Sequence, residues 1–329
     1  MIFMEIPITQ SKEWQKLQDE LGENSFLVDE EKFHYLAIVK NLPYGHYLYL
    51  PYGPNYVKKS DFKLALNSLK NLAEQRNAIF IRIEPRDPSF TDYQPNSAKK
   101  STDLNPKETW ILDLLGTEDE LKSRMPSRLL RYHKSAAKKG ITIEISHNPD
   151  DIHYLLDLQK ALASKKGINT FSEEYLKTEL KQPFASLYLV RYTQSADQNQ
   201  TDDKKVADLQ GHPVSEVIAA GLVFDHDKTR YNLQGAQSDL GRKLHATGIL
   251  TIQLILDAKE KDLTTFDFWG IAPEGAPDTH PWAGFTNFKK TFAGYERDYA
   301  GTYDIVLKPF KYKIYQLTRK INRLLRRGK

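Results

Sequence analysis

The chain has no cysteine among its 329 residues. This absence excludes a disulfide framework, a thiol nucleophile and a thiolate-bound metal. No apolar run approaches the roughly 20 residues that cross a bilayer, and the apolar segment at residues 1–7 lacks the basic flank of a secretory signal. We therefore expect a cytoplasmic protein, with a peripheral position at the inner face of the plasma membrane as the alternative.

Several catalytic motifs are missing as well. The chain has no His-Glu-x-x-His, no Gly-x-Ser-x-Gly and no P-loop, which argues against a zinc protease, a hydrolase elbow and a nucleotide kinase. Its nine histidines are scattered, so we expect no metal site. An acyl-CoA loop would read Gln/Arg-x-x-Gly-x-Gly/Ala, and the nearest segment, residues 241–248, does not fit that pattern.

Length and patterning predict two α/β (α+β) domains. The chain exceeds one average domain, and its 40% hydrophobic and 27% charged content is typical of a globular protein. Helix and strand patterns alternate, and a second series of similar elements starts near residue 148. The predicted division is residues 1–147, residues 148–302 and a basic C-terminal helix over 303–329, in a monomer.

Turn and breaker residues mark the ends of the predicted elements. Strands are expected at residues 33–39, 47–50, 78–83 and 109–114, and Pro85 ends the third of these because proline cannot donate to a strand ladder. A helical pattern over residues 118–139 is expected to break at Pro126. Residues 193–213 read as a long polar insert.

The C-terminal segment is strongly basic. Residues 308–329 hold nine lysines and arginines and no acidic residue. Ile314, Leu317, Ile321 and Leu324 share one helical face, which predicts an amphipathic helix whose apolar residues dock it or contact lipid. Such a localised cation indicates a phosphate-rich partner or an anionic membrane, and a solvated helix end is the plainer interpretation.

The run Phe266-Asp267-Phe268-Trp269-Gly270-Ile271 predicts a buried aromatic strand. A loop rich in proline and glycine follows, and the block over residues 284–294 then carries Phe288 and Lys289. Lys289 is thereby expected near a strand end, where a cation stabilises the oxyanion of acyl transfer. A solvated surface lysine is the plainer alternative.

Arg82 and Glu84 lie at the end of another predicted strand, on the same face by alternation. A carboxylate there is suited to orienting an attacking amine or accepting its proton. A structural salt bridge or loop cap is the alternative.

These pieces, taken in order, resemble the Fem family over nearly the whole chain. The resemblance rests on residues 10–14, 49–54, 82–85, 106–110, 125–140 and 231–235, the Trp269-Gly270-Ile271 strand end and the Phe288-Lys289 block. It implies two tandem acetyltransferase-like (GNAT) domains without the long helical arm of some members, and a last helix that returns to the first domain. It also implies transfer of an amino acid from aminoacyl-tRNA to the stem peptide of a lipid-linked or UDP-linked peptidoglycan precursor. Such an enzyme would build the interpeptide bridge of the cell wall.

The resemblance also assigns expected roles to residues. Glu84 and Lys289 would be catalytic, with no covalent enzyme intermediate, no metal and no coenzyme, and aminoacyl-tRNA would be the co-substrate. Substrate-binding positions would be Trp14, Lys16, Gln18, Tyr52, Arg82, Tyr175, Tyr231, Trp269 and Phe288. Contacts to tRNA or phosphate would come from Arg128, Arg131, Lys134, Arg319, Arg323 and Arg326.

Two other functions remain open on the sequence alone. One is an acyl-CoA N-acetyltransferase of the same fold, although the missing pyrophosphate loop argues against it. The other is a non-enzymatic protein that binds RNA or a membrane through the basic tail, which would tolerate changes at Glu84 and Lys289.

Overall fold

The computed structural model describes residues 5–166, 171–194 and 215–327. Its chain forms two compact units: residues 1–108 with 298–329, and residues 109–297. The expected boundary at 147/148 falls inside the second unit, because strand β7 (Glu108–Asp113) pairs with β12 (Thr265–Gly270) in that unit's sheet. The predicted polar insert at 193–213 lies almost wholly outside the described residues.

The first unit is built on a mixed sheet with strand order β1-β2-β3-β5-β14-β6, and β4 pairs with β2 off this path. Its strands are β1 (Ser25–Asp29), β2 (Phe33–Leu42), β3 (Gly45–Leu50), β4 (Asn55–Tyr56), β5 (Phe80–Ile83), β6 (Ala98–Lys100) and β14 (Tyr303–Val306). The strands predicted at residues 33–39 and 47–50 are present as the antiparallel neighbours β2 and β3. β14 comes from the far end of the chain and pairs with β5.

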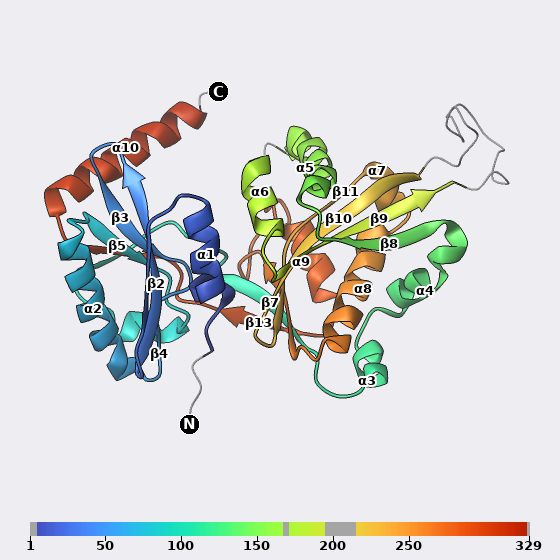
Figure 1. The fold of residues 1–329 in the computed structure, drawn as a ribbon, viewed down its shortest axis with the longest axis horizontal. Helices are drawn as coiled ribbons and strands as arrows, with labels where there is room; N and C mark the ends of the chain where they lie inside the picture. The colour runs from blue at the N-terminus through green and yellow to red at the C-terminus, as the bar shows by residue number, and fades with distance from the viewer. Residues whose placement is uncertain (1–4, 167–170, 195–214, 328–329) are drawn as a thin grey trace. The chain divides into compact units, whose positions relative to one another are not determined.

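Three α-helices accompany this sheet: α1 (Lys12–Glu20), α2 (Phe62–Gln75) and α10 (Pro309–Arg327) (Figure 1). α2 packs into a core with Ile81 and Ile83 of β5, whereas α10 contacts Phe80, which points to the opposite face of the same strand. The last helix therefore belongs to the first unit.

The second unit holds a seven-stranded sheet with order β13-β7-β12-β11-β10-β9-β8. Besides β7 and β12, its strands are β8 (Ile141–Ser146), β9 (Ala185–Thr193), β10 (Ser215–His226), β11 (Thr229–Gln237) and β13 (Tyr295–Asp298). β11 and β12 are parallel neighbours, and the helix pair between them makes the crossover.

The helices of the second unit are α3 (Glu118–Ser123), α4 (Ser127–Ser135), α5 (Ile152–Lys166), α6 (Glu173–Leu180), α7 (Asp239–Lys243), α8 (Ala246–Glu260) and α9 (Ala283–Lys290). The predicted break at Pro126 is present between α3 and α4. α5 contacts β10 and β11, and α8 packs in the core with Phe266 and Phe292. Across the described ranges, no helix is long and apolar enough to span a membrane.

Candidate active site

Each unit contains a pair of parallel strands with a short register. In the first unit, β3 and β5 pair from Leu48/Ile81 to Leu50/Ile83, and both strands then end. In the second unit, β11 and β12 pair from Thr229/Thr265 to Tyr231/Asp267, after which each strand continues beside its other neighbour. The carboxyl ends of parallel strands are a usual place for ligands. Both predicted catalytic residues follow such an end.

Lys289 lies at the strand end of the second unit. It sits in the last turn of α9, and its Nζ donates to the carbonyl oxygen of Gly270, the last residue of β12, at 2.6 Å. Burial lowers the pKa of Lys289 to about 8, while the charge of Asp267 acts in the opposite direction. The ammonium is thus partly removed from water, which strengthens its effect on nearby charge.

Asp267 shapes the backbone at the same place. Its buried carboxylate accepts the backbone N–H of Trp269 at 2.7 Å, and Trp269 has a left-handed φ of 66°. The Trp269 ring meets the ring of Tyr231 edge-on, with centroids 6.2 Å apart. The structure therefore places the rings of Tyr231 and Trp269 in contact near the end of β12, where Lys289 is held through Gly270.

Two other predicted positions of the second unit have different surroundings. Phe288 packs against Phe292, with ring centroids 5.6 Å apart, and joins the core beside α8. Tyr175 in α6 hydrogen-bonds to Glu179, a buried carboxyl group whose pKa burial raises to about 8. Phe288 is thus a packing residue, and Tyr175 belongs to a buried polar cluster.

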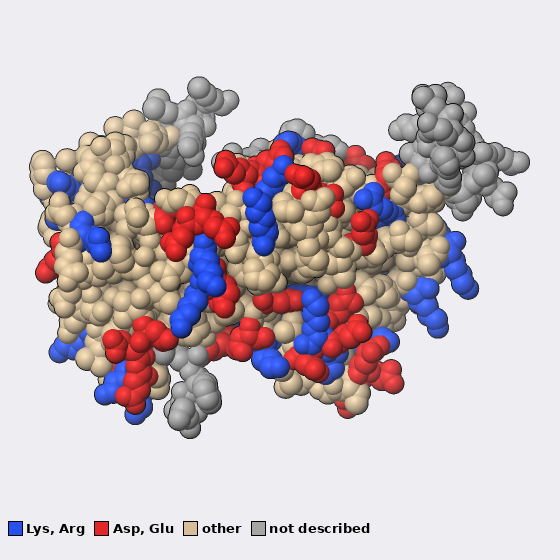
Figure 2. Space-filling model, viewed as in Figure 1, with Lys and Arg blue, Asp and Glu red and all other residues tan. Residues whose placement is uncertain are grey.

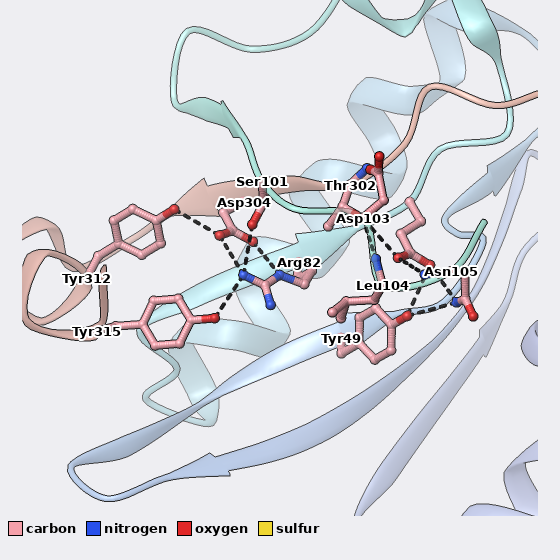
Figure 3. Close-up of polar contacts among 11 residues, drawn as sticks. Tyr49, Arg82, Ser101, Asp103, Leu104, Asn105, Thr302, Asp304, Tyr312 and Tyr315 are labelled. Carbon is pink, nitrogen blue, oxygen red and sulfur yellow. Dashed lines mark hydrogen bonds and ion pairs between the residues drawn. The ribbon is translucent and has the colours of Figure 1, made fainter. Parts of the chain in front are cut away.

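In the first unit, Glu84 is buried and accepts five hydrogen bonds. Its Oε2 accepts from the Tyr49 hydroxyl at 3.0 Å, the Tyr52 backbone N–H at 3.3 Å and Asn105 Nδ2 at 2.8 Å. Its Oε1 accepts from the Asn105 backbone N–H at 3.2 Å and the Thr302 hydroxyl at 3.0 Å (Figure 3). A carboxylate with this many donors is suited to fixing loops in place.

The donors around Glu84 come from three separate segments. Tyr49 is the next-to-last residue of β3, Asn105 lies before β7, and Thr302 precedes β14. Burial raises the pKa of Tyr49, and the Glu84 carboxylate adds to the increase. Tyr49 therefore stays a neutral hydroxyl that donates to Glu84.

Tyr52 is also held by the first unit. Its hydroxyl donates to the Pro106 carbonyl oxygen at 2.8 Å, and its ring lies 5.1 Å from that of Tyr299. The residue is buried and has a φ of 52°. Its backbone strain is offset by these contacts and by the bond from its N–H to Glu84.

Arg82 pairs with Asp304, not with Glu84. Its Nε and Nη2 donate to the two Asp304 carboxylate oxygens at 2.7 and 2.8 Å, and Nη2 also donates to Ser101 Oγ and Tyr315 Oη. Burial opposes the charged form, but the Asp304 bonds and charge outweigh it and raise the pKa of Arg82. All these partners belong to the protein, which favours the structural salt bridge over substrate binding (Figure 3).

The remaining predicted positions do not converge on either strand end. Trp14 and Gln18 are buried in α1, whereas Lys16 is exposed. Arg128, Arg131 and Lys134 are exposed along α4. Arg319 lies over the Tyr315 ring, 5.8 Å from its centroid. The side chains of Arg323 and Arg326 lie outside the described residues.

Sequence reasoning missed the partners that hold the predicted residues. These are Asp304, Asn105, Thr302, Asp267 and Glu179. Asp267 could have been found from the sequence, since it is a charged residue inside the predicted buried aromatic strand at residues 266–271. Asp304 is 222 positions from Arg82, and no local pattern joins the two.

Among the described residues, no group of three or more histidine, aspartate or glutamate side chains is arranged to hold a metal ion.

Comparison with known proteins gives a family match. Residues 189–320 match the model of the FemAB family. The lipid II:glycine glycyltransferase of Staphylococcus aureus (strain USA300) is 22% identical, over 88% of this chain and 83% of the relative. The protein of the same name from Staphylococcus epidermidis (strain RP62A) is 21% identical, over 96% and 89%. The predicted resemblance to the Fem family is confirmed.

Solved structures support the predicted fold. The crystal structure of FemX matches with a TM-score of 0.75 at 17% identity, covering 94% of both chains. The structure of L-PGS from Bacillus licheniformis matches with a TM-score of 0.55 at 14% identity, covering 97% of this chain and 99% of the other. The expected α/β architecture is confirmed.

Proposed function

We propose that this chain, whose residues 189–320 match the FemAB family, transfers an amino acid from aminoacyl-tRNA to the stem-peptide amine of a peptidoglycan precursor. Its relatives are named as glycyltransferases that act on lipid II, and an acyl-transferring enzyme follows from that match. The observation that carries the chemistry is Lys289, a partly desolvated cation at the end of a parallel strand pair.

The reaction is the aminolysis of an ester. The amine nitrogen attacks the aminoacyl carbonyl carbon, a C–N bond forms, and the C–O bond to the terminal ribose of the tRNA breaks. The nitrogen loses a proton and the departing ribose oxygen gains one. Negative charge develops on the carbonyl oxygen before the C–O bond breaks, and a positioned donor stabilises it.

Lys289 supplies such a donor. An ammonium has three N–H donors, and the Gly270 carbonyl takes one of them. The others are available to the oxyanion or to the departing ribose oxygen. The Gly270 bond positions the head group, so little reorganisation is needed when charge develops. The lowered pKa of about 8 also suits proton transfer near neutral pH.

Glu84 acts in this proposal by orientation. Its five hydrogen bonds hold the segments that carry Tyr49, Tyr52 and Asn105. For Glu84 to take a proton from the amine, at least one of these hydrogen bonds would have to break. The hydrogen bonds thus favour a positioning role, and direct proton transfer remains the alternative.

The test is a transfer assay with defined substrates. The protein is incubated with individually charged tRNAs and with either lipid-linked or UDP-linked pentapeptide precursors, and the muropeptide mass is measured. The expected product is heavier by one amino-acid residue and depends on the charged tRNA. No gain with any charged tRNA, together with an acetyl gain from acetyl-CoA, would instead establish an N-acetyltransferase.

A matched pair of variants connects the product to the site. Lys289→Ala should abolish most of the product, whereas Lys290→Ala should not. Lys290 is the adjacent lysine, but it is exposed and pairs with Glu296 at 3.2 Å. Equal activity in both variants would remove Lys289 from the mechanism.

A further inference from the structure

The C-terminal helix α10 exposes a row of large apolar side chains. Phe310, Ile314, Leu317 and Ile321 are 78%, 37%, 59% and 46% exposed. Their spacings of four, three and four residues place them on one face of the helix. We call these four residues the apolar stripe. Exposed single apolar residues are ordinary, but a contiguous row indicates an interaction surface.

The apolar stripe does not attach α10 to the first unit. That attachment uses Tyr312 and Tyr315, which are buried. The Tyr312 ring meets the Phe80 ring edge-on and the Tyr315 ring is tilted against it, with centroids 5.2 and 4.9 Å from that of Phe80. The Tyr312 hydroxyl donates to Asp304 at 2.8 Å, and Tyr315 accepts from Arg82 at 3.0 Å. At 100° per residue, the stripe lies roughly opposite these tyrosines.

Basic residues flank the apolar stripe. Helical spacing puts Lys313 and Lys320 on one side and Lys311 on the other, and all three are exposed. No acidic residue occurs from Lys308 to the last residue of the sequence. In Figure 2, the surface around α10 is mainly uncharged with scattered basic residues. The face thus combines an apolar centre with cationic edges.

We propose that α10 binds an anionic lipid surface through the apolar stripe and its flanking lysines. A helix with an apolar face bordered by lysine and arginine lies in the plane of a membrane interface, with the apolar side chains among the acyl chains. The lysines meet the lipid phosphates. A tRNA partner would use the charges but would leave Phe310 and Leu317 exposed to water, so the stripe favours lipid.

Lipid binding by α10 would favour one of the two forms of the peptidoglycan precursor. If the proposed function holds, a membrane-bound α10 brings the first unit to the lipid-linked form of the precursor rather than to the nucleotide-linked form. That step rests on the proposed function, whereas the lipid binding itself does not.

Vesicle co-sedimentation of the full chain tests the lipid binding. Vesicles of phosphatidylcholine alone are compared with vesicles that also contain phosphatidylglycerol. Two variants are measured, Phe310→Ser/Leu317→Ser for the stripe and Lys313→Gln/Lys320→Gln for the charges. The control, Lys63→Gln/Leu64→Ser, changes an exposed lysine and a 43% exposed leucine on α2. Circular dichroism verifies that every variant is folded.

The expected result is binding to the anionic vesicles only. The stripe variant should lose at least about tenfold in partitioning, since it removes two large apolar side chains from the acyl boundary. The charge variant should lose binding and show a weaker salt dependence, and the control should match the wild type. Equal binding by the wild type, stripe and control variants would overturn the proposal.

Two other partners are covered by parallel measurements. If the charge variant loses tRNA affinity while vesicle binding is absent in all proteins, α10 is a tRNA contact and the lipid proposal fails. If the wild type is a dimer by light scattering, the stripe variant is a monomer and neither binds vesicles, the stripe is a self-association surface and the proposal also fails. Transfer to a soluble nucleotide-linked acceptor should be unchanged in the stripe variant, which separates this inference from the proposed reaction.

Discussion

Lys289 Nζ lies 2.6 Å from the carbonyl oxygen of Gly270, at the end of β12 where that strand has parted from β11. A lysine on a helix is in this way anchored to the end of a strand, and its free N–H groups are held near the site where the strands separate. The first unit uses the same position differently, because the carboxylate of Glu84 follows the end of β5 there.

Replacing Lys289 with methionine should lower turnover by at least about 100-fold, as is typical for the loss of one oxyanion donor. The free energy of unfolding should change little or rise, because the variant no longer buries a charge. Steady-state turnover and thermal unfolding check the two parts, with Lys290→Met as the matched control. Near-normal turnover in the folded Lys289 variant would contradict the assignment.

The rate should also depend on pH through Lys289. The charged form is the donor, and its pKa is about 8, so turnover should decline as pH rises above that value and the ammonium loses its proton. Lys289→Arg stays charged across this range, and any activity it retains should lack the alkaline decline. A decline near pH 8 that is the same in wild type and Lys289→Arg would assign it to another group.

Glu84→Gln should destabilise the first unit by about 1–3 kcal/mol, because one acceptor oxygen becomes an amide that faces donors. Turnover should fall because the segments around Tyr52 and Asn105 become more mobile. The shape of the pH–rate profile should stay that of the wild type. Hydrogen exchange around those segments and the pH profile are the measurements. Disappearance of an acidic limb in the variant, without faster exchange, would identify Glu84 as the base.

Local signals in the sequence located much of the fold. Pro85 follows the end of β5 and Pro126 separates α3 from α4, as predicted, since each proline removes a backbone donor. The strand end with Trp269 and its approach to Lys289 were also predictable, because aromatic strand, loop and helix are consecutive in the chain.

Long-range partners could not be predicted in this way. β14 enters the first sheet from residues 303–306, and only that pairing brings Asp304 to Arg82. The sequence also did not show which face of α10 packs against the first unit. The expected apolar face includes Leu317, which is 59% exposed, whereas the buried contacts come from Tyr312 and Tyr315. A tyrosine can bury its ring while its hydroxyl makes a hydrogen bond, so such residues do not stand out as an apolar face in the sequence.

Asp304→Asn should destabilise the protein by about 3–5 kcal/mol, since it leaves the Arg82 guanidinium buried without its charged partner. Asp304 also accepts from Tyr312, so the helix α10 should loosen and its amides should exchange faster. Denaturant unfolding and hydrogen exchange over residues 309–322 check this. The control is Glu144→Gln, which breaks an exposed pair with Arg191 and should cost less than about 1 kcal/mol. Equal costs would show that the buried pair contributes no more than a surface one.

Glu179 should make the second unit lose stability as pH rises. Burial raises its pKa to about 8 from an ordinary 4.5, so between these values the unfolded chain ionises while the folded protein keeps the proton. The free energy of unfolding then falls with rising pH over that window and levels off above it. At about 1.4 kcal/mol per pKa unit, a rise of about 3.5 units makes the full loss on the order of 5 kcal/mol.

Glu179→Gln should remove this slope. The amide still accepts from Gln234 Nε2, which donates to Glu179 at 3.2 Å, and it can donate to the Tyr175 hydroxyl. The variant should therefore match the wild type near pH 4 and exceed its stability at pH 9. Glu174→Gln, an exposed change on the same helix, should keep the wild-type slope. Denaturant unfolding of the three proteins from pH 4 to 9 measures this directly. Parallel curves for all three would mean that Glu179 is ionised in the folded state and that water reaches the cluster with Tyr175 and Gln234.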